Sequence, residues 1–144
     1  MLSISKSCKT ILLVLLLWGC GSSISLFSEQ AYQQAISLKI ESLSLMDNAV
    51  EPFEAHQDEV LELKKQLDIA HEYAKGRPKN EITTRQWAIL TDSSRNLLGG
   101  FLKRWKDSNT LSRTFIRESK GLISDGFDTI IGLESGKIKP SDVE

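Results

Sequence analysis

Apolar residues recur at three- and four-residue steps along most of the chain, and this spacing predicts amphipathic helices. The first expected helix covers about 29–50, with Ser28 as its N-cap, and the second covers about 52–75. A third covers about 84–107 and a fourth about 111–134. No alternating strand pattern occurs, so the predicted fold is all-α, a small four-helix up-and-down bundle.

The third helix carries signals that predict a break. Asp92-Ser93-Ser94 offers a second N-cap inside it, and Gly99-Gly100 lowers its stability by up to about 2 kcal/mol relative to alanine. We expect these glycines to allow a close helix–helix approach, with a hinge as the less favoured alternative. Thr83-Thr84-Arg85-Gln86 predicts a capping box at its start. Gly121 and Gly126 predict a close crossing or a kink in the fourth helix.

The first helix has two neighbouring apolar rows. One row contains Tyr32, Ile36, Ile40, Leu43, Met46 and Val50. The other contains Ala31, Ala35, Leu38, Leu45 and Ala49. Together they form a wide apolar stripe, which is typical of a helix inside a bundle rather than one lying on a surface.

The N-terminus has the pattern of a secretory signal, because Lys6 and Lys9 precede the apolar residues 11–18. Eight apolar residues are too few to span a bilayer, which needs about 20 in a helix. Leu17-Trp18-Gly19-Cys20 resembles the lipobox of bacterial lipoproteins. The resemblance implies cleavage between Gly19 and Cys20 and acylation of Cys20, palmitate being a typical acyl group.

This resemblance divides the chain into a signal peptide (1–19), a lipidated tether (20–28), a helical domain (29–136) and a flexible tail (137–144). Gly21 after the cysteine implies the outer membrane, facing the periplasm, rather than the inner membrane. The residues from Gly21 to Ser28 reach at most about 28 Å. Cys8 is removed and Cys20 is acylated, so the mature chain holds no disulfide, no cysteine-ligated zinc and no thiol nucleophile.

Charge is distributed unevenly although the net charge of the chain is only −1. Residues 26–74 hold ten acidic and three basic side chains, residues 75–120 hold four acidic and eleven basic ones, and 121–144 hold five acidic and two basic ones. Two explanations stay open. Either the acidic hairpin packs on the basic half, or part of the basic surface stays uncovered and meets an anionic partner. The candidate binding face for that partner contains Arg95, Lys103, Arg104, Trp105, Lys106, Arg113 and Arg117.

The chain lacks the residue patterns of common catalytic and metal sites. His71-Glu72-Tyr73-Ala74-Lys75 has a lysine where the zinc-protease motif needs its second histidine. His56 and Glu59 lie one turn apart without an evident third ligand, and no serine lies in a G-x-S-x-G elbow. We therefore expect no enzyme activity, no metal and no cofactor.

These observations predict a lipid-anchored accessory protein of the cell envelope, a helical binding module that holds an envelope protein partner near the membrane. The alternative is a binder of an anionic ligand or surface, such as lipid headgroups or cell-wall polymer, through a basic helical face. Nucleic acid is not expected as a partner in that compartment.

Overall fold

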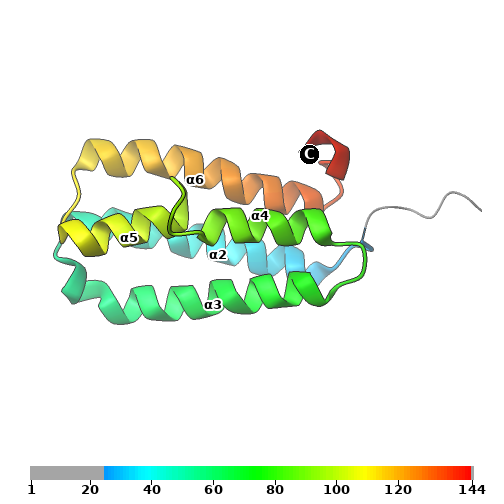
Figure 1. Ribbon diagram of the computed structural model, residues 1–144, viewed down its shortest axis with the longest axis horizontal. Helices are drawn as coiled ribbons and strands as arrows, with labels where there is room; N and C mark the ends of the chain where they lie inside the picture. Colours follow the sequence, from blue (N-terminus) through cyan, green and yellow to red (C-terminus); the bar gives the residue numbers. More distant parts are fainter. Residues whose placement is uncertain (1–24, 144) are drawn as a thin grey trace, which may run out of the picture.

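The computed structural model describes residues 25–143, which form an all-helical bundle (Figure 1). Its α-helices are α2 (Glu29–Asp47), α3 (Gln57–Gly76), α4 (Glu81–Thr91), α5 (Leu98–Ser108) and α6 (Arg113–Glu134). Short 3-10 helices cover η2 (Asn48–Val50), η3 (Phe53–His56) and η4 (Pro140–Asp142). The predicted four-helix bundle is confirmed, with α4 and α5 sharing the third position.

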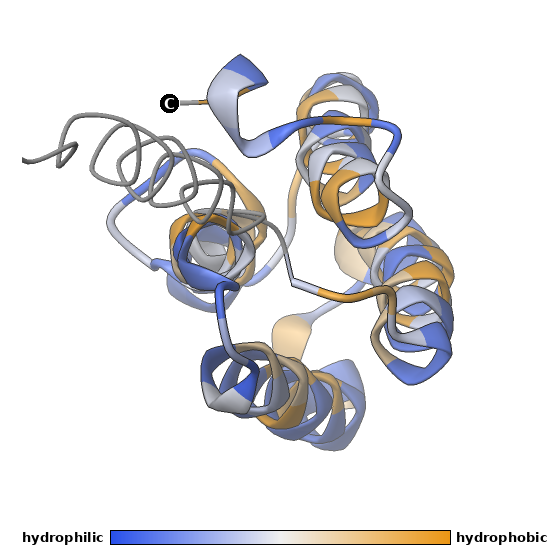
Figure 2. Ribbon diagram, turned by 90° about the vertical axis from the view of Figure 1, so that its right-hand side faces the viewer, coloured by the Kyte–Doolittle hydropathy of each residue, from blue (hydrophilic) through white to orange (hydrophobic). Residues whose placement is uncertain are grey.

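The helices follow one another around a common core. α2 packs against α3 and α6, and α4 also packs against α3 and α6. Successive positions run in opposite directions (Figure 1), and the end-on view shows the four positions around a shared interior (Figure 2). In that interior the rings of Trp87 and Phe127 meet edge to face at 6.0 Å, and Leu63 and Ile123 are fully buried. This arrangement is an up-and-down bundle.

The N-caps agree with the sequence at α2 but not at α4 or α6. Ser28 Oγ accepts a hydrogen bond from the amide of Ala31, as predicted. α6 begins at Arg113, two residues after the expected start at about 111, and its N-cap is Ser112. The predicted capping box is wrong because α4 already begins at Glu81, three residues before the expected start.

The third helical position breaks between α4 and α5, as predicted. Asp92 does not cap a new helix: its Oδ1 accepts hydrogen bonds from the amide and hydroxyl of Ser94, and this turn is followed by further loop residues before α5 begins. A Cβ on Gly99 would lie 2.1 Å from the carbonyl oxygen of Thr91, and one on Gly100 would lie 1.7 Å from that of Arg95. The glycines therefore let the end of α4 and the connection lie directly against α5.

α6 runs without interruption despite its glycines. A Cβ on Gly126 would lie 3.2 Å from a Leu90 methyl carbon, so the predicted close approach is confirmed there. Gly121 has no neighbour within 4 Å, and the same prediction is wrong for it. Gly136 ends the helix with a φ of 72°. The tail beyond it, which the sequence indicates as flexible, folds back so that Ile138 packs over Gly132.

One end of the bundle, which we call the tether end, is where the chain enters α2. There the guanidinium of Arg77 pairs with the buried carboxylate of Glu134 and donates a hydrogen bond to the carbonyl of Leu26. The hydroxyls of Ser28 and Tyr73 also lie within hydrogen-bond distance, 3.1 Å apart. These contacts join the entry of the chain to α3 and α6. The opposite end, which we call the far end, contains η2, the end of α5 and the start of α6 (Figure 1).

Ion pairs between the acidic and basic segments are rare. Among the ion pairs within residues 25–143, Lys120–Asp47 at 2.6 Å joins 26–74 to 75–120 between two helices, and Lys75–Glu72 at 3.2 Å joins them within α3. Other pairs lie within a segment, such as Lys65–Glu62, or involve 121–144, such as Lys39–Asp128. The acidic hairpin therefore does not neutralise the basic half by pairing across the bundle, and most of its cations are exposed to solvent.

Candidate interaction surface

The residues predicted as one binding face do not share a face, and Trp105 is not on the surface. Its side chain is 0% exposed. Its Nε1–H donates to the carbonyl of Glu51 at 3.0 Å, and its ring meets that of Phe53 edge to face at 5.5 Å. Trp105 lies four residues after Phe101, so both point to the core side of α5. The expectation that Trp105 borders an exposed apolar patch is therefore wrong.

The three basic residues around Trp105 point in different directions. Successive side chains of an α-helix are about 100° apart, so Lys103, Arg104 and Lys106 are spread around the outer surface of α5. Lys103 forms an ion pair with Asp107 on the same helix. The guanidinium carbon of Arg104 lies 4.6 Å from the centre of the Phe115 ring. Because Phe115 belongs to α6, Arg104 is the one of these three residues that contacts α6.

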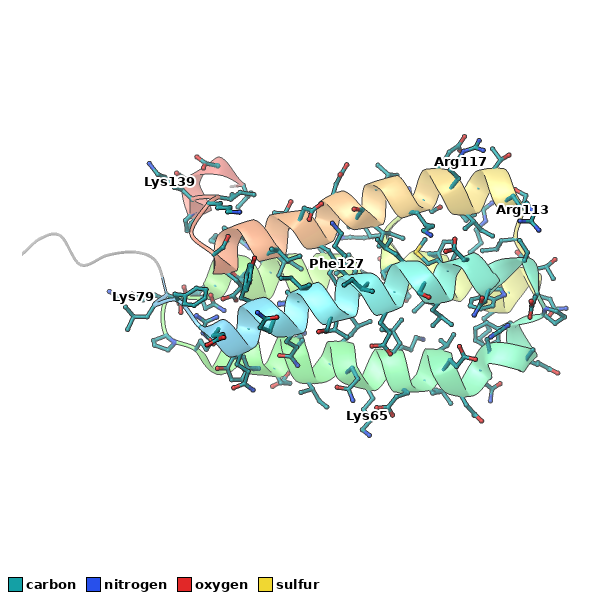
Figure 3. All side chains as sticks on the ribbon, turned by 180° about the vertical axis from the view of Figure 1, so that it is seen from behind. Lys65, Lys79, Arg113, Arg117, Phe127 and Lys139 are labelled. Carbon is teal, nitrogen blue, oxygen red and sulfur yellow. The ribbon has the colours of Figure 1, made fainter. Side chains whose placement is uncertain are left out.

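The remaining predicted residues lie elsewhere. Arg95, in the connection between α4 and α5, pairs with Asp92 at 3.5 Å. Arg113 and Arg117 lie on the side of α6 that faces α2, where Lys120 joins them in lining an open groove of about 420 Å³. Figure 3 shows Arg113 and Arg117 at the far end of α6. We call Arg113, Arg117 and Lys120 the basic stripe.

A second groove, of about 310 Å³, lies between α5 and α6. Its lining includes Phe101, Arg104, Phe115, Glu118 and Leu122, and we call it the α5–α6 groove. The rings of Phe101 and Phe115 stack with centroids 6.0 Å apart and planes 3° from parallel. Leu122, at the edge of the groove, is 57% exposed. The groove therefore combines an aromatic floor, an exposed aliphatic side chain and an arginine.

The break in the third position explains why this groove exists. α4 packs closely against α6, whereas the backbones of α5 and α6 approach one another at few points. The rings of Phe101 and Phe115 fill part of the space between these two helices. Aromatic residues and arginine are enriched among the residues that dominate protein–protein binding energy. Phe115 and Leu122 lie seven residues apart on one side of α6, away from the buried Ile116 and Ile123.

The outer surface of α2 exposes one large apolar side chain, that of Ile40. The row Ala35, Leu38 and Leu45 is buried in the bundle, as predicted. The other row is divided: Met46 is fully buried and Leu43 and Val50 pack against the core, whereas Ile40 is 65% exposed. The prediction that both rows face the core is therefore wrong for Ile40.

Opposite charges border this outer surface of α2. On one side, a groove of about 620 Å³ between α2 and α3 is lined by Glu41, Glu59 and Glu62. On the other side lies the basic stripe of α6. In Figure 3, α2 lies in front between α6 and α3. We call the outer surface of α2, the acidic groove and the basic stripe together the α2 face.

His56 forms a separate polar cluster at the far end. Its Nε2 lies 2.9 Å from a Glu51 carboxylate oxygen and its Nδ1 lies 3.1 Å from one of Glu59. The hydrogen bond to Glu51 is the main reason that the pKa of His56 is raised above its ordinary value of 6.5, and Glu59 adds to the effect. The ring also lies over Trp105, with centroids 5.6 Å apart. Each ring nitrogen thus has its own carboxylate, which is the arrangement of a protonated imidazole.

No cluster of three histidine, cysteine or acidic residues suited to a metal ion occurs within residues 25–143. The same part of the chain contains no helix that is both long and apolar enough to cross a bilayer. The lipobox residues Gly19 and Cys20, and the signal peptide as a whole, lie outside the described residues. Comparison with protein-family models, curated proteins and solved structures finds no match for this chain.

Proposed function

We propose that the chain is a lipid-anchored, non-catalytic interaction module that holds an envelope protein near the membrane, and that the partner binds in the α5–α6 groove. The observation that carries this proposal is the combination of exposed Leu122, partly exposed Phe115 and Arg104 in one groove, above the buried ring of Phe101. Large apolar side chains with an arginine at their border are the usual centre of a protein–protein interface.

The position of the groove suits a partner that lies away from the anchoring membrane. The chain enters the bundle at the tether end, while α5 lies in the far half (Figure 1). α6 alone, with 22 residues, is about 33 Å long. A tether of at most about 28 Å keeps the near end at the lipid surface. The α5–α6 groove then faces the periplasm.

The chemistry of the groove defines the kind of partner. An apolar side chain of the partner packs on Phe115 and Leu122, and a carboxylate of the partner pairs with Arg104. Arg104 already stacks on Phe115, so little side-chain freedom is lost when it binds a carboxylate. Glu118 disfavours an acidic group at the opposite wall. The partner is therefore a protein with an apolar residue beside an acidic one.

A second candidate function is the binding of an anionic ligand by the basic stripe. The observation in its favour is that Arg113 and Arg117 make no ion pair within residues 25–143. These residues lie at the far end, so cell-wall polymer suits them better than the headgroups of the anchoring membrane.

The test is photo-crosslinking in cells, with a photoreactive amino acid in place of Leu122 in the lipidated chain. Three backgrounds are compared: wild type, Arg104→Glu, and Lys65→Glu on the exposed outer side of α3 (Figure 3). Mass spectrometry identifies what is attached. Lys65→Glu changes the net charge as much as Arg104→Glu does, and it leaves the groove intact.

The proposal predicts one recurrent envelope protein crosslinked at Leu122, at least ten-fold reduced by Arg104→Glu and unchanged by Lys65→Glu. Cell-wall fragments as the main product would favour the second candidate. Equal crosslinking in all three backgrounds would contradict a role for the groove.

A further inference from the structure

The α2 face has the properties of a surface that is incomplete in one copy of the chain. Ile40 lies opposite the buried row of α2 and is 65% exposed, and Ile36, one turn before it, is partly buried. A bundle helix normally has one apolar stripe facing the core and a polar outer surface. α2 instead also exposes Ile40 on its outer surface.

The charges that border this outer surface are complementary to one another. Glu41, Glu59 and Glu62 lie on the α3 side, and the basic stripe lies on the α6 side. Lys120 of the stripe is already paired with Asp47 of its own chain, so Arg113 and Arg117 are the cations that remain for a partner. The hydrogen bond from the Gln66 amide holds the pKa of Glu62 below its ordinary value, so this carboxylate stays ionised at neutral pH. One surface therefore carries an acidic and a basic border with the exposed Ile40 between them.

We infer that the α2 face binds the α2 face of a second copy of this chain, in a parallel two-fold dimer. A two-fold axis along α2 places the α6 of each copy opposite the α3 of the other. The basic stripe of each copy then meets the acidic groove of its partner, and the outer surfaces of the two α2 helices meet in the centre. Such an interface is isologous, so it closes at two copies.

The positions of the charges along the helices agree with this parallel arrangement. The basic stripe occupies the first three turns of α6, which start at the far end. Glu59 and Glu62 occupy the first two turns of α3, which also start at the far end. In a parallel dimer these turns lie at the same height. An antiparallel dimer would move them to opposite ends of the interface.

The parallel arrangement also places both tether ends on the same side, which suits two copies anchored in one membrane. This argument rests on the proposed lipid anchor. The contact is small: α2 is about 28 Å long and its neighbours lie 8–10 Å away, so about 500 Å² per copy is covered. A total near 1,000 Å² is at the lower limit of specific interfaces. The dimer is therefore weak in solution and is favoured by confinement to a membrane surface.

The experiment uses disulfide formation in the full-length chain in oxidising envelope membranes. Gln33→Cys and Ile40→Cys introduce thiols on the outer side of α2, near the tether end and near its centre. Leu61→Cys, on α3 at 57% exposure, is the matched control away from the face. The wild-type chain reports any disulfide made by Cys8 or Cys20. In a parallel dimer each α2 cysteine faces its own counterpart.

The dimer predicts disulfide-linked pairs from both Gln33→Cys and Ile40→Cys, at least five-fold above Leu61→Cys and wild type. Arg117→Glu in the Ile40→Cys background lowers the yield several-fold because it faces Glu62 of the other copy. Adding Glu62→Lys to the same chain restores the disulfide yield, because position 117 of one copy can then pair with position 62 of the other, with the two charges exchanged. A folding defect would not be restored by the second change.

Pairs from Ile40→Cys without pairs from Gln33→Cys would overturn the parallel dimer. Equal yields at Leu61→Cys, or yields unaffected by Arg117→Glu, would also overturn it, as would attachment to another protein only. None of these results involves the α5–α6 groove. Failure of the dimer and failure of the proposed partner binding are therefore read separately.

Discussion

The α2 face and the α5–α6 groove each expose an apolar side chain beside arginine, yet they differ in the kind of partner that each can bind. The α2 face carries acidic and basic borders of its own, so a second copy of the chain supplies every group that it needs. The α5–α6 groove has one arginine, stacked on an aromatic ring, and one carboxylate, that of Glu118, beside an exposed leucine. Its proposed partner is a different protein. The extent of charge complementarity within one surface, more than apolar exposure, separates self-association from binding of another protein.

Both surfaces depend on the buried ion pair at the tether end, and its loss should have the largest effect. Glu134→Ala leaves the guanidinium of Arg77 mostly buried without a carboxylate, which destabilises the fold by about 3–5 kcal/mol. Denaturant unfolding measures this change. Glu72→Ala, which breaks the exposed pair with Lys75, is the control and should change stability by less than about 1 kcal/mol. Similar losses in the two variants would show that the buried pair does not join α3 to α6.

A methyl group at Gly99 should affect one surface more than the other. Its Cβ would lie 2.1 Å from the Thr91 carbonyl oxygen, so α5 must move, at a loss of at least about 1–3 kcal/mol. Crosslinking at Leu122 should then fall, while disulfide formation at Ile40→Cys persists. Gly121→Ala is the matched control, because nothing lies within 4 Å of its Cβ and alanine stabilises a helix by up to about 1 kcal/mol. Equal thermal stabilities of the two alanine variants would contradict this account of the break.

Removing the guanidinium that stacks on Phe115 should separate binding from folding. Arg104→Gln loses a cation–π contact of about 0.5–1 kcal/mol at an exposed site, so the bundle stays folded. Binding of the partner at Leu122 should weaken by at least ten-fold if a carboxylate pairs with Arg104. Circular dichroism checks the fold and crosslinking checks the binding. Lys106→Gln, on another side of α5, should leave both unchanged.

The smallest effect concerns His56, which lies at the border of the α2 face through its contact with Glu59. Its pKa is raised in the fold, chiefly by Glu51, so protonation stabilises the folded chain. This contribution is fully present below the ordinary value of 6.5 and is lost as the pH rises through the raised pKa. His56→Gln should therefore reduce the unfolding free energy at about pH 6 and have less effect at about pH 9. A difference from wild type that is independent of pH would contradict this.

The bundle itself could be predicted from the sequence because local signals agree with the packing. Ser28 precedes an apolar run and caps α2, and Gly136 ends α6 with a positive φ. The break after Thr91 follows from Asp92 and the glycine pair. The start of α5 could not be predicted in this way, because Asp92 forms a turn with Ser94 instead of capping α5.

The candidate site was predicted less well, because neighbours in sequence are not neighbours on a helix surface. Trp105 lies between Arg104 and Lys106 in the chain, yet it points to the core with Phe101. Leu122 and Ile40 have the helical spacing of the apolar residues in their helices. Only the positions of the adjacent helices determine which of these apolar residues are covered. Charge totals for each segment also gave no indication of which cations would pair across two helices, as Lys120 does with Asp47.

The most direct measurement is parallel photo-crosslinking in cells at Ile40 and Leu122 of the lipidated chain, with mass spectrometry of both products. The two residues have similar exposure, 65% and 57%, and lie on the two different surfaces. The account predicts a second copy of the chain attached at Ile40 and another envelope protein attached at Leu122. The same product at both positions, or a second copy at Leu122 alone, would contradict it.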